Sequence, residues 1–469
     1  MVVDVHALDG KIPPPETRYD VVVVGAGASG IAAALAATEA GKSVLLVDEN
    51  PVSGLSMGND VPLFYGGRMT AAVQNPARMV EQMLASQPAL EAAFEAGVEV
   101  LLGTTAWGLY RNGPAMRTLP GSLLGLADAE RAWMVGFDRL VLATGARDVV
   151  LGFAGWDRPG VMGPQGFHAL LACYDALASR RVLILGSGEL ALQTALLALD
   201  HGLEVAGIVE VRDVVQGPFA LIARIMAAGV PIHLGTTVRG VIGGIDGIEH
   251  AILRLVGGGA DIEIACDTVC LALAIAPATE LLEAAGAKPG GDIELAGDAA
   301  GLLPDMAYIA DWSRAFGSVA PADTIVCQCE AVTRADLLGV QPPVYLDRPA
   351  AQAARSLQTL AADGPAHPDQ IKRLTRAGMG LCQGRRCRTQ VACLLAETSN
   401  LLVDDVPVAS FRAPVRPIPL GILADWHERA DMGAGWDVWF GIPTQWTPYA
   451  DIGTPREAEV VAHGSNMHV

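Results

Sequence analysis

Apolar residues in this chain gather in short continuous runs, and several of these runs end at glycines. The first run, Val21–Val24, consists of four consecutive valines and follows a polar segment that contains prolines. A short unbroken apolar run is typical of a parallel strand that is buried on both faces. An alanine-rich segment over 31–40 favours a helix, and a second apolar strand is expected over 43–47. The pattern therefore predicts a strand–helix–strand unit near the N-terminus.

Glycines occupy the turn between the first strand and the helix in the spacing G-x-G-x-x-G. Backbone N–H groups at a helix N-terminus favour a pyrophosphate, and glycines let it approach closely. Two acidic residues follow the second strand, about 20 residues further on, where a ribose hydroxyl needs a carboxylate. We expect a dinucleotide site there, formed by Gly25, Gly27, Ala28, Gly30, Asp48 and Glu49.

The same arrangement recurs in the middle of the chain. A strand over 181–185 leads into a turn with Gly186 and Gly188, and a helix runs through 199. A second strand over 205–209 ends at Glu210. Alanine in the third glycine position is an accepted variant. The sequence predicts a second dinucleotide-type fold, which either binds a nucleotide there or keeps the fold without that function.

Two further strand ends carry polar residues that suit a nucleotide. A strand that begins at residue 139 runs into an Ala-Thr-Gly turn with Thr144 and Gly145. Another strand, beginning at residue 293, ends at Gly297 and Asp298. No catalytic residues can be assigned, because the nine histidines are scattered and no nucleophile motif is present.

Half of the eight cysteines lie in two tight pairs in the C-terminal third. Soft thiolates presented from two loops suit an iron–sulfur cluster. Zinc, a disulfide or incidental buried thiols are the alternatives, and Cys-x-Cys is tight for one tetrahedral zinc. The paired cysteines are Cys327, Cys329, Cys382 and Cys387. The other four are interpreted as ordinary buried cysteines, namely Cys173, Cys266, Cys270 and Cys393.

Amino-acid composition narrows the kinds of function that the protein can have. The 469 residues are 51% hydrophobic, which allows large cores, and the net charge of −19 makes nucleic acid an unfavourable partner. No apolar run is long enough for a membrane span, and the N-terminus lacks the apolar core of a signal peptide. A cytoplasmic location is expected, where paired cysteines more often mean metal than disulfide.

The two glycine turns, the Ala-Thr-Gly turn and Gly297-Asp298 together resemble the glutathione-reductase-like flavoproteins, which have two Rossmann-like dinucleotide domains. The resemblance implies that the first turn binds FAD and that Asp298 reaches its ribityl chain. It also implies that NAD binds at the second turn and that Glu210 disfavours NADP. A structural ATP or ADP is the alternative ligand. The chain departs from this group in two ways, since it has no Cys-x-x-Cys motif and 53–58 keeps only Gly54 of a glycine pair.

The strings around the paired cysteines resemble the bacterioferritin-associated-ferredoxin-like [2Fe-2S] domain. The whole order of segments is similar to the α subunits of amine and imino-acid dehydrogenases, such as opine oxidases, proline and hydroxyproline dehydrogenases and hydrogen cyanide synthase. The resemblance implies an α/β protein with a small helical module. The expected parts are an FAD domain over 18–150 and 276–319, an inserted nucleotide domain over 151–275, a [2Fe-2S] domain over 320–398 and an extension over 399–469.

In that family the substrate is oxidised on a separate FAD-containing β subunit, and some members also have a small ferredoxin-like γ subunit. The resemblance thus implies an electron-transferring subunit of an enzyme that acts on an opine, proline, hydroxyproline or glycine type of substrate. FMN at a subunit contact is a further possibility. The alternatives are a self-sufficient NAD(P)H-dependent reductase and a scaffold subunit with structural nucleotides. A tail with Trp426, Trp436, Trp439 and Trp446 is a candidate subunit contact.

Overall fold

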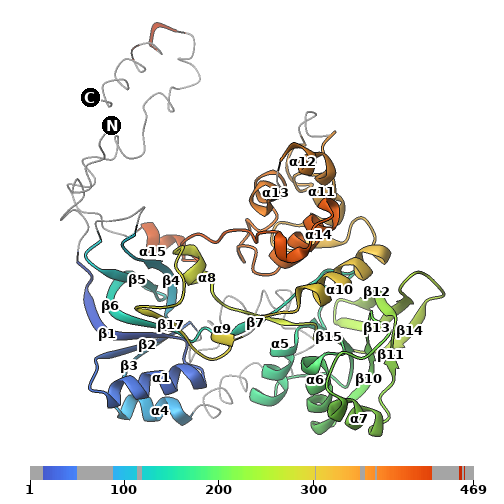
Figure 1. The fold of residues 1–469 in the computed structure, drawn as a ribbon, viewed down its shortest axis with the longest axis horizontal. Coiled ribbons are helices and arrows are strands. Elements are labelled where there is room, and N and C mark those ends of the chain that lie inside the picture. Colours follow the sequence, from blue (N-terminus) through green and yellow to red (C-terminus); the bar gives the residue numbers. More distant parts are fainter. Residues whose placement is uncertain are drawn as a thin grey trace.

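The computed structural model describes residues 14–49, 88–113, 119–301, 303–348, 354–364, 367–424, 454–456 and 459. These residues form two α/β lobes and a smaller, mainly helical module next to the second lobe (Figure 1). The predicted α/β class with two Rossmann-like units is confirmed. The turn over 53–58 and the four tryptophans of the tail lie outside the described residues.

The first lobe is built on a mixed sheet with the strand order β3-β2-β1-β6-β5-β4, and β17 adds to it by pairing in parallel with β6. Strands β3, β2, β1 and β6 are mutually parallel, whereas β4, β5 and β6 run antiparallel. These strands are β1 (Thr17–Val24), β2 (Val44–Asp48), β3 (Glu99–Leu102), β4 (Thr105–Tyr110), β5 (Ser122–Ala127), β6 (Ala132–Leu142) and β17 (Ile293–Leu295).

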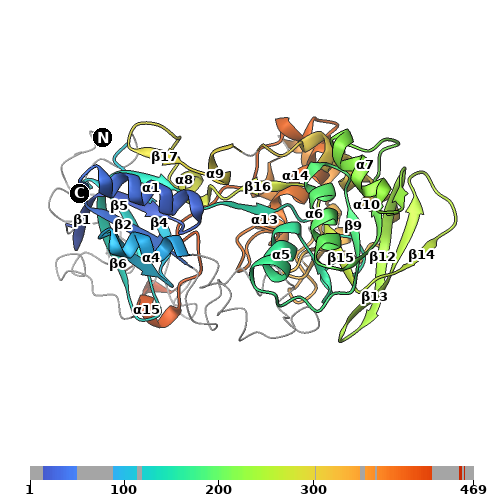
Figure 2. The same ribbon diagram turned by 90° about the horizontal axis from the view of Figure 1, so that it is seen from below.

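Helices α1 (Ala28–Glu39) and α4 (Pro88–Glu95) cover one face of this sheet (Figure 2). Helix α1 begins three residues before the predicted start at residue 31. Its first turn includes Gly30, where a Cβ atom would stand 1.8 Å from the carbonyl oxygen of Gly25. The opposite face packs against α8 (Glu280–Ala284) and against Phe411 and Val415 from the far end of the chain.

The second lobe contains a parallel sheet with the order β11-β10-β9-β15-β8 and a three-stranded antiparallel sheet with the order β12-β13-β14. Its strands are β8 (Val161–Met162), β9 (Arg181–Leu185), β10 (Glu204–Val209), β11 (Ile232–His233), β12 (Thr236–Gly244), β13 (Gly247–Leu255), β14 (Ile262–Ala265) and β15 (Thr268–Leu271). Its helices are α5 (Pro164–His168), the π-helix η2 (Ala169–Cys173), α6 (Glu189–Asp200) and α7 (Phe219–Ala227).

Two short antiparallel strands join the lobes, β7 (Ala146–Asp148) and β16 (Ile275–Pro277). The chain leaves the first lobe through β7, labelled in Figure 1, and returns through β16, labelled in Figure 2, so this pair forms the crossing between them. After β17 and the short helix α9 (Asp298–Gly301), the chain passes through α10 (Met306–Val319), which packs against β12 and α14.

The helical module carries the paired cysteines. It contains β18 (Ile325–Cys327), β19 (Val332–Thr333), α11 (Arg334–Leu338), α12 (Leu357–Asp363), α13 (Pro368–Thr375), α14 (Arg388–Ser399) and the 3-10 helix η4 (Val403–Asp405). Its apolar side chains form one continuous core with those of the second lobe, with Trp312 of α10 fully buried between them. A last helix, α15 (Leu420–Ala424), follows the module. Within the described part of the chain, no helix combines the length and apolar character needed to cross a bilayer.

Asp148, at the end of β7, is a buried carboxyl group at the crossing. Its side chain is 2% exposed, and Oδ1 accepts a hydrogen bond from the backbone of Gln165 at 3.1 Å. Oδ2 has no hydrogen-bond partner. Burial raises the pKa of Asp148 to about 7. The folded protein therefore holds a proton that the unfolded chain releases near pH 4.

This raised pKa predicts a pH-dependent stability difference between the native protein and Asp148→Asn. The contribution of Asp148 is fully present below its unfolded pKa and is lost as the pH rises through about 7. We expect the amide variant to gain free energy of unfolding relative to the native protein between pH 5 and pH 8, measured by urea titration. Asp246→Asn, at an exposed position, is the control and should show no such trend. An equal difference at both pH values would contradict the assignment.

Candidate functional site

A cavity of about 320 Å³ opens at the carboxyl ends of β1, β2 and β6 in the first lobe. The carboxyl end of a parallel sheet is where open α/β folds bind ligands. The structure brings most of the predicted first-site residues to its wall. Those that line it are Gly25, Gly27, Asp48, Glu49, Thr144, Gly145 and Asp298.

Glycine stands at the three positions of the first turn for different local reasons. Gly25 has φ +108°, and a Cβ atom there would lie 2.2 Å from the carbonyl oxygen of Ala143. Gly30 allows α1 to pack on the turn, as described above. No atom lies within 4 Å of a Cβ built on Gly27, which lines the cavity. Two glycines thus fit the close packing of the turn, and the third leaves room for a bound group.

Polar contacts hold the other predicted residues in place. Oδ2 of Asp48 accepts a hydrogen bond from the backbone N–H of Ala26 at 2.6 Å. Thr144 Oγ1 donates to the carbonyl oxygen of Ala278 at 2.5 Å, which ties the Ala-Thr-Gly turn to the chain returning from the second lobe. Asp298 begins α9 and faces the cavity.

Two predicted residues support the turn from outside the cavity wall. Gly297 has φ +61°, and a Cβ atom there would lie 2.6 Å from Ser29 Oγ. Ala28 is the first residue of α1.

Sequence reasoning missed one wall of this cavity. Val415 and Arg416 line it, although they follow the cysteine module in the chain. Arg416 Nε and Nη2 donate to Glu49 Oε2 and Oε1 at 2.6 and 3.1 Å. No local signal in the sequence could have found this contact, because 367 positions separate the two residues.

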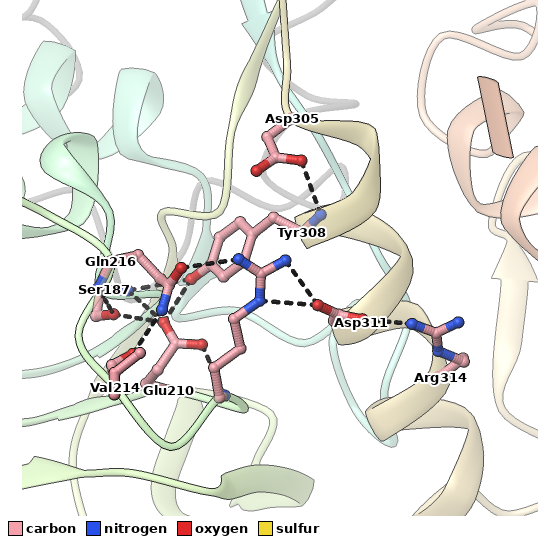
Figure 3. A network of polar contacts seen from close by, with 9 residues as sticks. Ser187, Glu210, Val214, Gln216, Asp305, Tyr308, Asp311 and Arg314 are labelled. Carbon is pink, nitrogen blue, oxygen red and sulfur yellow. Dashed lines mark hydrogen bonds and ion pairs between the residues drawn. The ribbon is translucent and has the colours of Figure 1, made fainter. Parts of the chain in front are cut away.

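The second glycine turn differs from the first because several groups of this chain donate hydrogen bonds to its carboxylate, Glu210 (Figure 3). Glu210, at the end of β10, is fully buried. Its Oε2 accepts hydrogen bonds from Ser187 N, Ser187 Oγ and Tyr308 OH at 3.1, 2.5 and 2.7 Å. Its Oε1 accepts from Arg212 N at 2.9 Å. The oxygens predicted to take ribose hydroxyls are therefore hydrogen-bonded within the chain.

A loop and a helix close over this turn. The backbone N–H of Gln216 donates to Ser187 Oγ at 3.0 Å, and a Cβ atom at Gly217 would lie 3.0 Å from the carbonyl oxygen of Ser187. Arg212 stands 4.9 Å from the ring centre of Tyr308 and forms an ion pair with Asp311 of α10 at 2.7 Å. Gly186 and Gly188 keep the shape of a dinucleotide turn, and no atom lies within 4 Å of a Cβ built on Gly188, as at Gly27. It is the carboxylate side of the turn, at Glu210, that this chain fills.

The four paired cysteines come together in the helical module. Cys327 ends β18, and Cys387 lies at the start of α14. Cys327, Cys382 and Cys387 are buried and Cys329 is half-buried. Side-chain hydrogen bonds join Cys327 to Cys387 and Cys329 to Cys382, so each bond links one motif to the other. All eight cysteines are free thiols, and of the other four, Cys173 is half-buried where we expected burial.

The thiol contacts between the two motifs shift the pKa values of the cysteines. The hydrogen bond from Cys387 lowers the pKa of Cys327, and the hydrogen bond from Cys329 lowers the pKa of Cys382. The backbone N–H of Gly378 also points at Cys327 Sγ, at 3.5 Å. Within the described ranges, no group of three or more ligating side chains lies close enough to hold a single metal ion.

Fold and site together define an oxidoreductase of the type with two dinucleotide domains. The chain matches the pyridine nucleotide-disulphide oxidoreductase family over residues 19–301. It therefore belongs to this family, which supports the expected FAD binding. A second match, over residues 349–426, is to the sarcosine oxidase A3 domain; it includes Cys382 and Cys387 but begins after Cys327 and Cys329.

Several curated proteins are similar over most of the chain. One of the opine oxidase subunits of Agrobacterium tumefaciens is 27% identical, over 87% of this chain and 91% of the relative. The alpha subunit of sarcosine oxidase from Rhizobium meliloti is 26% identical over 87% of this chain but only 42% of the relative, so this chain spans less than half of that protein. The HcnB subunit of hydrogen cyanide synthase from Pseudomonas aeruginosa is 24% identical, over 85% and 97%.

Among solved structures, L-proline dehydrogenase from P. horikoshii is similar with a TM-score of 0.51. It is 19% identical and covers 87% of this chain and 79% of its own. At this identity the likeness concerns the fold alone.

The buried network at Glu210 predicts a stability difference between two tyrosine substitutions. Tyr308→Phe removes a donor from a fully buried carboxylate, which should cost about 1–3 kcal/mol of the free energy of unfolding. Tyr345→Phe removes the same type of bond, to Glu330 at 2.6 Å, where the tyrosine is 56% exposed, and should cost much less. Urea titration of both variants measures the difference. Equal costs would show that burial of Glu210 does not determine the effect.

Proposed function

We propose that this chain is the electron-transferring flavin and iron–sulfur subunit of a heteromeric dehydrogenase that oxidises an amine or imino acid. The observation that carries the proposal is the presence of both a dinucleotide cavity and a four-cysteine cluster in one chain. The cavity would hold a flavin dinucleotide, and the cluster of thiols would hold an iron–sulfur group. Substrate oxidation is assigned to a partner subunit that carries its own FAD.

FAD fits the cavity of the first lobe. Gly27 leaves the space beside the helix N-terminus free, as a pyrophosphate needs. Asp48 would take the adenosine ribose, and Asp298 would reach the ribityl chain near the Ala-Thr-Gly turn. When bound, FAD supplies electron transfer in one- or two-electron steps. The protein's own contribution is to orient the cofactor and to enclose it on the side of residues 415–416.

A [2Fe-2S] cluster fits the four cysteines better than a single zinc ion does. A zinc site needs about four ligands around one ion, whereas a two-iron cluster takes two thiolates at each iron. The closest thiol contacts join Cys327 to Cys387 and Cys329 to Cys382, which suits two irons with two thiolates each. Cys327, Cys329, Cys382 and Cys387 are the proposed ligands, and backbone N–H groups such as that of Gly378 would stabilise the sulfur charge.

The partner and substrate class rest on the relatives. The opine oxidase, sarcosine oxidase and hydrogen cyanide synthase relatives are each named as one subunit of a larger enzyme. We therefore propose that the partner is an FAD-containing β subunit, and that the substrate is of the opine, proline, hydroxyproline or glycine type. An FMN at a subunit contact and a γ subunit belong to the same proposal.

The hydrogen bonds at Glu210 bear on the alternatives. A self-sufficient NAD(P)H-dependent reductase needs an open nicotinamide nucleotide site, and Glu210 is already bonded to Ser187, Tyr308 and Arg212. This arrangement favours the subunit proposal over the reductase. A scaffold subunit with structural nucleotides differs in its redox behaviour, since its cofactors would not be reduced during turnover.

The cysteine assignment predicts the metal content of single variants. Replacing any one of Cys327, Cys329, Cys382 or Cys387 by serine should abolish the reduced-cluster electron paramagnetic resonance signal, because serine is a poor ligand for iron. FAD bound per chain should change far less. Cys173→Ser, outside the pairs, is the matched control and should keep the signal. Stoichiometric zinc in place of iron and sulfide in anaerobically purified protein would overturn the assignment.

The partner assignment predicts activity only in the complex. The purified chain alone should not oxidise opines, proline, hydroxyproline or glycine, whereas the complex with its β subunit should reduce a dye acceptor with one of them. Anaerobic stopped-flow absorption with NADH serves as the comparison and should show no rapid flavin bleaching. Turnover by the isolated chain would contradict the subunit proposal, and rapid bleaching by NADH would support the reductase.

A further inference from the structure

The segment 411–416, which we call the return segment, lies between the FAD-type cavity and the cysteine loop 382–387. We propose that Arg416 binds the adenosine end of the dinucleotide and that the return segment couples this binding to the state of the cysteine loop. The inference rests on the proposed function and adds a binding residue and a coupling to it.

The return segment is part of the first lobe although it follows the cysteine module in the chain. Phe411 and Val415 are 6% and 2% exposed and belong to the core of the first lobe. The backbone N–H of Val415 donates to the carbonyl oxygen of Trp107 at 2.8 Å. The first lobe therefore holds one side of the segment from which Arg416 extends.

Arg416 would lie beside the adenosine part of a bound FAD. Its guanidinium group makes a two-point contact with Glu49, and its side chain is 13% exposed. Glu49 directly follows Asp48, the residue at the adenosine ribose position. Both Glu49 and Arg416 line the cavity.

The charge of the contact between Arg416 and Glu49 indicates which part of a ligand it recognises. Because the Glu49 carboxylate offsets the guanidinium charge, the site suits an uncharged adenosine better than an additional phosphate. A planar guanidinium held by a carboxylate can stack on an aromatic ring such as adenine.

The cysteine loop contacts the same segment from the other side. Gln383 Nε2 donates to the carbonyl oxygen of Pro414 at 2.6 Å, and Arg385 Nη1 donates to that of Val415 at 2.9 Å. Gln383 and Arg385 lie between Cys382 and Cys387. Arg388 stands 4.4 Å from the ring centre of Phe411.

Two successive carbonyl groups thus connect the cysteine loop to the residue that precedes Arg416. A change in the loop that breaks these bonds shifts the backbone that carries Arg416, and so changes dinucleotide affinity. Thermodynamic linkage makes the effect reciprocal, because a bound dinucleotide must then stabilise the loop by the same factor.

The binding role is tested with Arg416→Gln in the full-length chain. Fluorescence titration should show affinity for FAD and for ADP reduced about tenfold, or about 1.4 kcal/mol, from the loss of one stacking contact. FMN, which lacks adenosine, should bind both proteins equally. Arg412→Gln is the matched control, because Arg412 is exposed on the same segment, and it should bind FAD as the native chain does. Far-ultraviolet circular dichroism verifies folding of both variants.

The outcomes separate this inference from the proposed function. Unchanged affinity of Arg416→Gln for FAD and ADP, with FAD bound by the native chain, would overturn the role of Arg416 and leave the proposed function intact. Failure of the native chain to bind FAD would overturn both. Equal loss in Arg412→Gln would also count against the inference, since general charge would then explain the effect.

The coupling is tested with Gln383→Ala, which removes a loop contact without touching the cavity. Its affinity for FAD should fall severalfold, and added FAD should slow iron release to a chelator in the native chain but not in Arg416→Gln. Native FAD affinity in Gln383→Ala, or iron release that is independent of FAD, would overturn the coupling.

Discussion

The packing of helix α10 between the second lobe and the cysteine module is the interaction on which the arrangement of the molecule depends. Trp312 and Phe316 of this helix are 0% and 1% exposed and join both parts in one core. Their rings lie 5.3 Å apart, and Phe153 of the second lobe packs on Phe316 at the same distance. The same helix carries Tyr308 and Asp311, which close the second glycine turn. One buried helix therefore sets the position of the cysteines and the state of that turn.

The two glycine turns show how one sequence device leads to two different sites. Asp48 and Glu210 each accept a hydrogen bond from the residue between the first two glycines, Ala26 and Ser187. Around Asp48 the structure leaves a cavity, whereas around Glu210 it places Tyr308 and the loop that contains Gln216. A buried carboxylate is costly unless it is hydrogen-bonded, so the donors that satisfy Glu210 also make it unavailable to a ribose.

The cysteine module is connected to the rest of the molecule on two sides. Its core merges with that of the second lobe, and the return segment 411–416 leads from it into the core of the first lobe. Arg388 at the start of α14 forms an ion pair with Glu283 of α8 at 3.0 Å. The first cavity and the paired cysteines therefore belong to one packed unit.

Local constraints in the sequence determined the two Rossmann-like units, the glycine turn at the first cavity and the identity of the paired cysteines. Buried parallel strands need unbroken apolar runs, and a turn with positive φ and close backbone contacts needs glycine at positions such as Gly25. Only the tertiary structure decided that Tyr308 blocks Glu210, that Arg416 completes the first cavity and that Cys327 meets Cys387. These contacts join residues 98, 367 and 60 positions apart, and such pairs are set by how elements pack, which leaves no periodic trace in the sequence.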